Sequence, residues 1–126
     1  MLAILLAIYV FHVTQLGIGI MSKRSKDMSR KAERKGRCLC GVVTVTAREA
    51  GNSVGACHCN MCRRWGGGPY MEIACGSAVS FGGEENVSVF DSSAWAERGF
   101  CSKCGTHLFY RLKGTGQHMI PVGVFE

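Results

Sequence analysis

Residues 57–64 read Cys57-His58-Cys59-Asn60-Met61-Cys62-Arg63-Arg64 and place three cysteines within six positions. On an extended strand, the side chains of residues 57 and 59 leave by the same face. Cys62 follows three residues later, the spacing at which one tight turn folds a third thiolate back onto the other two. Three converging thiolates form an incomplete tetrahedron. A zinc ion held there either keeps one position open for a substrate or is closed by a remote fourth ligand.

The other cysteines include two further close pairs, Cys38/Cys40 and Cys101/Cys104. The second pair lies in Gly99-Phe100-Cys101-Ser102-Lys103-Cys104-Gly105, which has the shape of a zinc knuckle. The simplest partition joins the two pairs into a closed four-thiolate site and leaves the triplet by itself. A disulfide within Cys38-Leu39-Cys40 or Cys57-His58-Cys59 would be badly strained, which favours metal binding. Cys75 lies in an apolar run, and we expect it to be a small buried residue.

The net charge of +6 is confined to a short segment of the chain. Residues 23–37 hold eight basic and two acidic residues, which is the whole excess, whereas seven basic residues balance seven acidic ones from residue 38 onward. The domain itself is therefore neutral, which argues against a basic nucleic-acid-binding face on it.

The first 22 residues carry no charge, and their length suits a bilayer span of about 20 residues. They are either a membrane anchor or an artefact of start-site choice, with translation beginning at Met21. Residues 23–36 are expected to form a basic, flexible leader, followed by one domain over residues 37–126. Basic residues after a membrane span stay on the cytoplasmic side, so both alternatives predict a cytoplasmic domain.

Residues 37–126 consist of short β-branched and aromatic runs separated by turns, which predicts a mainly β domain. Seventeen glycines and only two prolines are typical of such a turn-rich chain. Two short helical stretches are expected, one over residues 60–65 and one capped by Asp91-Ser92-Ser93 and running through Arg98. A domain of this size has too small a core to rely on alone, so a metal staple is expected.

Three motifs together resemble the glutathione-dependent formaldehyde-activating enzyme family, which includes centromere protein V-like proteins. They are Cys38-x-Cys40-Gly41, Cys57-His58-Cys59-x-x-Cys62-Arg63 and Phe100-Cys101-x-x-Cys104-Gly105-Thr106, and the match covers residues 37–126. The resemblance implies an Mss4-like, zinc-stapled β fold of short antiparallel strands with two zinc ions. It implies a structural zinc on Cys38, Cys40, Cys101 and Cys104, and a catalytic zinc on Cys57, Cys59 and Cys62.

The resemblance also implies a carbon–sulfur lyase that reversibly joins glutathione and formaldehyde into S-(hydroxymethyl)glutathione. Arg63 and Arg64 lie beside the triplet and are candidates for binding a glutathione carboxylate, although they could equally balance the charge of the site. Arg98 is a weaker candidate. Members of the family usually continue beyond the position of Glu126, so we expect a C-terminally truncated domain.

Two other functions stay open at this point. One is a non-catalytic zinc-binding module whose basic leader contacts nucleic acid or an acidic partner, which predicts salt-sensitive binding. The other is a zinc-dependent carbon–sulfur enzyme that acts on a different thiol adduct.

Overall fold

The structure is a computed structural model, and it describes residues 30–126. The predictions for residues 1–22 and for the first part of the basic leader fall on residues 1–29, outside the described residues. Residues 31–126 form one compact unit. Between residues 30 and 126, none of the helices combines the length and the apolar composition that a bilayer span requires.

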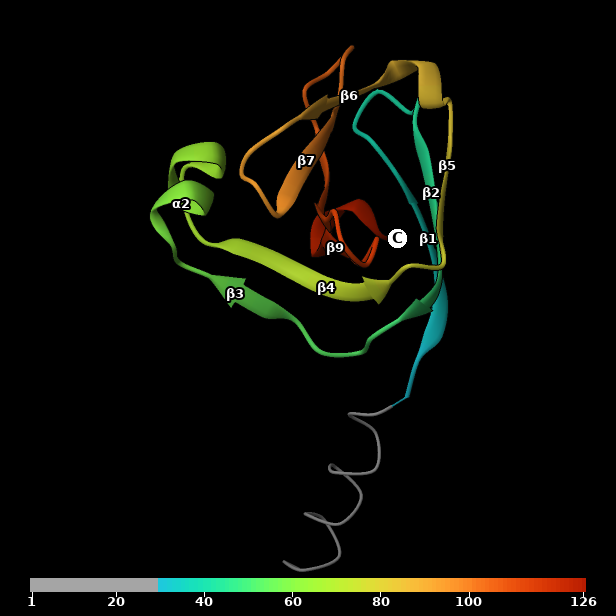
Figure 1. Ribbon diagram of the computed structural model, residues 1–126. Coiled ribbons are helices and arrows are strands. Elements are labelled where there is room, and N and C mark those ends of the chain that lie inside the picture. Colours follow the sequence, from blue (N-terminus) through green and yellow to red (C-terminus); the bar gives the residue numbers. More distant parts are fainter. Residues whose placement is uncertain (1–29) are drawn as a thin grey trace, which may run out of the picture. The chain divides into compact units, whose positions relative to one another are not determined.

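The domain is built from two antiparallel sheets (Figure 1), which confirms the prediction of a mainly β fold of short antiparallel strands. The three-stranded sheet has the order β1 (Ala32–Arg37), β2 (Thr44–Ala50), β5 (Val79–Gly82). The six-stranded sheet has the order β3 (Gly55–Cys57), β4 (Tyr70–Gly76), β9 (His118–Pro121), β8 (His107–Leu112), β7 (Ala96–Cys101), β6 (Val87–Phe90). Three short helices connect or follow strands: α2 (Asn60–Gly66), η1 (Glu84–Asn86) and η2 (Val122–Val124).

The hydrophobic core is shared by both sheets. Val45 of β2 packs in the same buried cluster as Ile73 of β4, Leu108 of β8 and Ile120 of β9. Burying one such side chain contributes about 1.5–3 kcal/mol. A hydrophobic core of this size contributes limited stability, so a small domain of this kind is expected to gain further stability from a bound metal.

The domain begins earlier than the sequence predicted. Strand β1 starts at Ala32, inside the stretch assigned to the flexible leader, and pairs with β2 from Arg37↔Thr44 to Ala32↔Ala50. Glu33, Lys35 and Arg37 are exposed and Arg34 is half-buried, so the backbone of β1 pairs in the sheet while most of its charged side chains stay at the surface. The C-terminal end adds to this pairing, because Gly36 bridges to Phe125.

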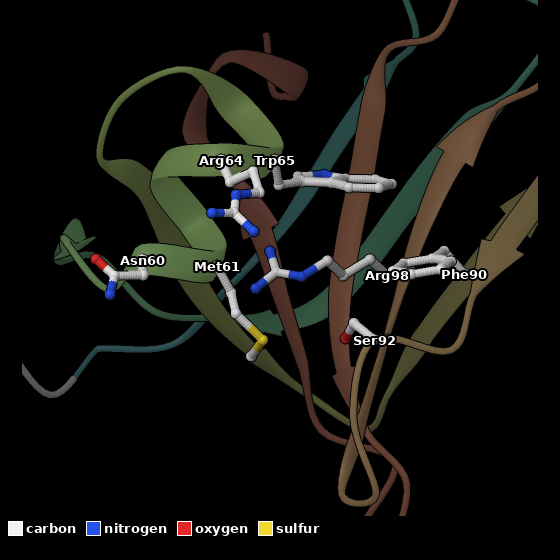
Figure 2. A pocket seen from close by; sticks show the side chains of 7 residues that line it. All are labelled: Asn60, Met61, Arg64, Trp65, Phe90, Ser92 and Arg98. Carbon is white, nitrogen blue, oxygen red and sulfur yellow. The ribbon is translucent and has the colours of Figure 1, made fainter.

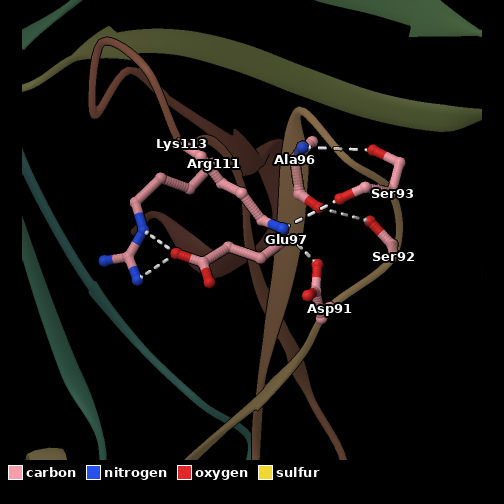
Figure 3. Close-up of polar contacts among 7 residues, drawn as sticks. All are labelled: Asp91, Ser92, Ser93, Ala96, Glu97, Arg111 and Lys113. Atoms are coloured by element: carbon pink, nitrogen blue, oxygen red, sulfur yellow. Dashed lines mark hydrogen bonds and ion pairs between the residues drawn. The ribbon is translucent and has the colours of Figure 1, made fainter.

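The helical stretch expected after Asp91-Ser92-Ser93 is wrong. Ser93 accepts a hydrogen bond from the backbone N–H of Ala96 (3.1 Å), but β7 follows and pairs with β6 and β8. Figure 3 shows the polar contacts that hold this turn against β8. Lys113 binds the Asp91 carboxylate and the Ser93 carbonyl. The serines therefore stabilise a turn between two strands, and pairing across the sheet decides the conformation.

The second cysteine-rich region, residues 57–62, begins at the last residue of β3 and precedes β4 in the chain. Figure 1 shows α2 at the end of β3 and β4 that lies away from β1, β2 and β5. Helix α2 contacts β4, and its residues 60–66 agree with the short helical stretch predicted there.

Candidate metal centres

Two facing turns form the first cysteine cluster. After β1, the N–H of Gly41 donates to the carbonyl of Cys38 (3.0 Å), and after β7 the N–H of Gly105 donates to the carbonyl of Cys101 (2.8 Å). Both glycines adopt left-handed backbone angles, with φ of 82° and 76°, which residues with a Cβ adopt at a steric cost. Each turn therefore folds its cysteine pair toward a common point.

The sulfur atoms of this cluster are spaced as zinc requires. The Sγ atoms of Cys38, Cys40, Cys101 and Cys104 all lie within 4.8 Å of one another. Cys40 Sγ is 3.6 Å from Cys38 Sγ and 3.9 Å from Cys101 Sγ. Zinc–sulfur bonds of about 2.3 Å give a tetrahedron with edges of about 3.8 Å. The four thiols therefore fit a closed zinc site that joins the first strand of the domain to β7.

Thr106 connects the two turns of the closed cluster. Its Oγ1 accepts a hydrogen bond from the backbone N–H of Leu39 (3.0 Å) and lies 3.1 Å from Cys104 Sγ. The hydrogen bond with the Thr106 side chain lowers the pKa of the Cys104 thiol to about 5. A thiol with that pKa is ready to bind a metal as thiolate at neutral pH.

The second cluster is the triplet Cys57, Cys59 and Cys62, whose Sγ atoms also lie within 4.8 Å of one another. Cys57 ends β3, and Cys59 is the N-cap of α2, where its sulfur accepts a hydrogen bond from the N–H of Cys62 (3.4 Å). Within residues 30–126, no histidine, carboxylate or further cysteine joins this cluster. The three thiols thus fit a zinc site that lacks a fourth side-chain ligand, as an open site requires.

The environment distinguishes the thiols of the triplet. The hydrogen bond from the Cys62 backbone lowers the pKa of the exposed Cys59 thiol to about 7. Burial raises the pKa of the Cys62 thiol to about 11. A coordinated metal ion would remove the proton of such a thiol, and a nearby positive charge favours the thiolate form as well.

Arg98 supplies such a charge. It reaches the triplet from β7, and its Nη2 donates to Cys62 Sγ (3.4 Å) although its side chain is only 2% exposed. Its guanidinium carbon lies 5.1 Å from the ring centre of Tyr110 and 5.9 Å from those of Trp65 and Tyr70. These ring faces attract the cation. From the sequence, Arg98 ranked below Arg63 and Arg64, which directly follow Cys62, and it was expected in a helical stretch, whereas it lies in β7.

A pocket of about 450 Å³ lies beside the triplet: none of the three cysteines lines it, but Asn60 and Met61, which separate Cys59 from Cys62, and Arg98 do. Figure 2 shows Arg64 and Arg98 directed into the same space. The side chains that line the pocket are Asn60, Met61, Arg64, Trp65, Phe90, Ser92 and Arg98. Arg63 does not line it; it borders a separate hollow on the surface of α2 with Asn60, Arg64 and Gly67. Of the two arginines predicted to bind substrate, only Arg64 faces this pocket.

Cys75 stays apart from both clusters. It is fully buried, and its thiol lies 3.3 Å from the carbonyl of Ile73, to which it donates. Burial raises its pKa to about 11. This is the environment of a small core residue, as the sequence predicted.

Comparison with known proteins yields matches of three kinds. A family model described as glutathione-dependent formaldehyde-activating enzyme matches residues 33–126. A protein of Schizosaccharomyces pombe (strain 972 / ATCC 24843), named as an uncharacterized lyase, is 38% identical over 95 residues, which are 75% of this chain and 69% of that protein. A crystal structure of a Rhodobacter sphaeroides protein aligns with a TM-score of 0.62 at 25% identity, covering 73% of this chain and 87% of that chain.

Proposed function

The chain belongs to the glutathione-dependent formaldehyde-activating enzyme family, and from this premise we propose that it is a zinc-dependent carbon–sulfur lyase. In the proposed reaction, the sulfur of glutathione bonds to the carbon of formaldehyde and the thiol proton ends on the oxygen. The product is S-(hydroxymethyl)glutathione, and the reverse reaction breaks the same carbon–sulfur bond. The observation that supports this proposal most is a three-thiol cluster beside a pocket, with no fourth side-chain ligand within residues 30–126.

We propose that Cys57, Cys59 and Cys62 hold the catalytic zinc. We assign the structural zinc to the closed cluster of Cys38, Cys40, Cys101 and Cys104. A zinc ion in the triplet supplies Lewis acidity toward a carbonyl oxygen and favours the thiolate form of a substrate thiol. Since both clusters need reduced cysteines, we place the protein in a reducing compartment, the cytoplasm.

The side chains around the triplet hold the reacting groups and adjust their charge. One zinc ion with three thiolates has a net charge of −1, and the buried guanidinium of Arg98 opposes it at Cys62 Sγ. Trp65 and Phe90 form an aromatic side of the pocket. We propose Arg64 as a substrate-binding residue and Arg63 as a charged residue at the outer rim.

Exchange spectroscopy tests the reaction directly. Glutathione and ¹³C-formaldehyde form the adduct slowly without a catalyst, and NMR exchange measurements report the rate in both directions at equilibrium. We expect the full, zinc-loaded chain to increase this rate, the Cys59→Ser variant to lose the increase, and the Cys75→Ala variant to keep it. The proposal would be contradicted if the full chain exchanged the adduct no faster than buffer alone, or if the Cys59→Ser variant exchanged it as fast as the full chain. Acceleration with another thiol and not with glutathione would favour a different adduct.

A further inference from the structure

We infer that the pocket next to the triplet is a carboxylate-binding subsite, in which Arg98 and Arg64 hold a carboxylate of the thiol substrate. The inference rests on the proposed function, because it names the class of thiol on which that reaction acts. It assigns the contact nearest to the triplet to Arg98 of β7. Arg64 makes a second contact with the carboxylate.

Arg98 has one amino group left to bind a ligand. Its Nη2 donates to Cys62 Sγ (3.4 Å), whereas its buried Nη1 has no hydrogen-bond partner among the described residues. A buried donor without a partner is destabilising. Arg98 lines the pocket, so a ligand oxygen bound there would remove this cost. The planar guanidinium group suits the two oxygens of a carboxylate.

The pocket is positively charged, because acidic side chains nearby are bound elsewhere. Its lining contains two arginines and no carboxylate. Glu97, the neighbour of Arg98 in β7, accepts a hydrogen bond from Nε of Arg111 (2.7 Å), and Asp91 is bound by Lys113 (Figure 3). Glu72 of β4 interacts electrostatically with Arg98 but does not line the pocket. The two guanidinium groups therefore have no acidic partner inside the pocket.

The aromatic side of the pocket fixes the position of a ligand. The Trp65 ring is stacked on His107, with ring centres 4.8 Å apart, and on Phe90, with ring centres 5.8 Å apart and planes at 10°. Such a stack holds the indole in one orientation. The pocket volume of about 450 Å³ lies in the range of about 300–1,000 Å³ that small-molecule sites occupy. An aliphatic or peptide backbone can pack on this surface while its carboxylate reaches the arginines.

The substrate class that follows is a thiol adduct with a carboxylate near the sulfur-bearing group. Glutathione, which has two carboxylates, belongs to this class. Neutral thiols of similar size do not, and the subsite would bind them weakly.

Binding of a thioether tests the subsite separately from catalysis. The probes are S-methylglutathione and its dimethyl ester, which have no thiol and differ in the carboxylates. Titration calorimetry with the full, zinc-loaded chain gives the affinities. Quenching of fluorescence in a Trp95→Phe background, which leaves Trp65 as the remaining tryptophan of two, reports binding in the pocket.

We expect the acid to bind about tenfold or more tightly than the ester, since a hydrogen bond to a charged group contributes about 1.5–3 kcal/mol. Arg64→Met should weaken binding of the acid by a similar factor and leave binding of the ester unchanged. Arg64 is exposed, so this variant keeps the fold. Arg98→Lys should have the same effect, whereas Arg48→Met, which removes an exposed arginine from β2, should have none.

Equal binding of acid and ester, or unchanged binding of the acid by Arg64→Met, would overturn the inference. The exchange assay keeps the two proposals apart. Equal acceleration with glutathione and with its diester would support the lyase activity and contradict the carboxylate subsite. Selective binding of the acid without any acceleration would support the subsite and contradict the proposed reaction.

Discussion

Replacing one cysteine in each cluster should separate a zinc site that holds the fold from one that does not. Cys104→Ser removes a ligand from the closed cluster, and Cys59→Ser removes one from the triplet. Both substitutions are otherwise mild. Cys104 is half-buried, and serine is a preferred N-cap residue, so it keeps the cap that Cys59 provides for α2.

The expected effects differ because the two clusters close loops of different length. The closed cluster joins Cys40 to Cys101 across 61 positions, whereas the triplet spans residues 57–62. If each cluster is treated as a cross-link, closing a loop of 61 residues stabilises the fold by about 4 kcal/mol, because it restricts the unfolded chain. Closing a loop of about five residues stabilises the fold by about 2 kcal/mol. Domains of this size are stable by about 5–15 kcal/mol. Loss of the closed cluster should therefore remove a large part of the stability, and loss of the triplet a small part.

Native mass spectrometry and urea unfolding at fixed free zinc measure both quantities. We expect two zinc ions in the parent chain and one in a folded Cys59→Ser variant with a slightly lower urea midpoint. Cys104→Ser should unfold at a much lower urea concentration. Cys75→Ala, which removes a cysteine outside both clusters, should keep two zinc ions. If Cys59→Ser destabilised the chain as much as Cys104→Ser, or if Cys104→Ser kept the parent midpoint, the assignment of the two clusters would be wrong.

Two further predictions concern the core. A Cβ at Gly99 would lie 2.2 Å from Cε1 of the buried Phe109 ring. Gly99→Ala should therefore destabilise the domain by about 1–3 kcal/mol in urea unfolding, whereas Gly66→Ala, with no atom within 4 Å of its Cβ, should not; equal midpoints would contradict this packing. His118 is buried, and burial lowers its pKa below the usual 6.5. The unfolded chain then binds a proton that the folded chain does not, so stability should be full above pH 6.5 and fall as the pH drops toward the lowered pKa. His118→Gln should flatten this fall in unfolding measured between pH 7.5 and 5, and an unchanged pH dependence would assign it to other groups.

The parts of the site that depend on local spacing could be predicted from the sequence. Cys57, Cys59 and Cys62 need only a strand end and one helical turn to converge, and both are encoded within six residues. The knuckle around Cys101 is local in the same way, since its turn depends on a glycine at residue 105.

The features that depend on pairing between distant segments could not be predicted in this way. Asp91-Ser92-Ser93 suits a helix N-cap as well as a turn, and the pairing of β7 with β8 decides between the two. Arg98, which ranked below Arg63 and Arg64 from the sequence, lies in this strand, where it and Ala96 are buried on either side of Glu97. Strand β1 was not predicted, because its run of charged residues is typical of a flexible segment. Its backbone nevertheless pairs with β2.

Strand β7 carries Arg98 at the pocket and, three residues later, Cys101 in the closed cluster. The two centres are therefore mechanically linked through one short piece of backbone. A substitution in the C-terminal knuckle, for example at Thr106, touches no pocket residue but disturbs the anchor of the strand that presents Arg98. The harm done by a natural variant of this protein should thus be judged by its effect on β7, and not by its distance from the pocket.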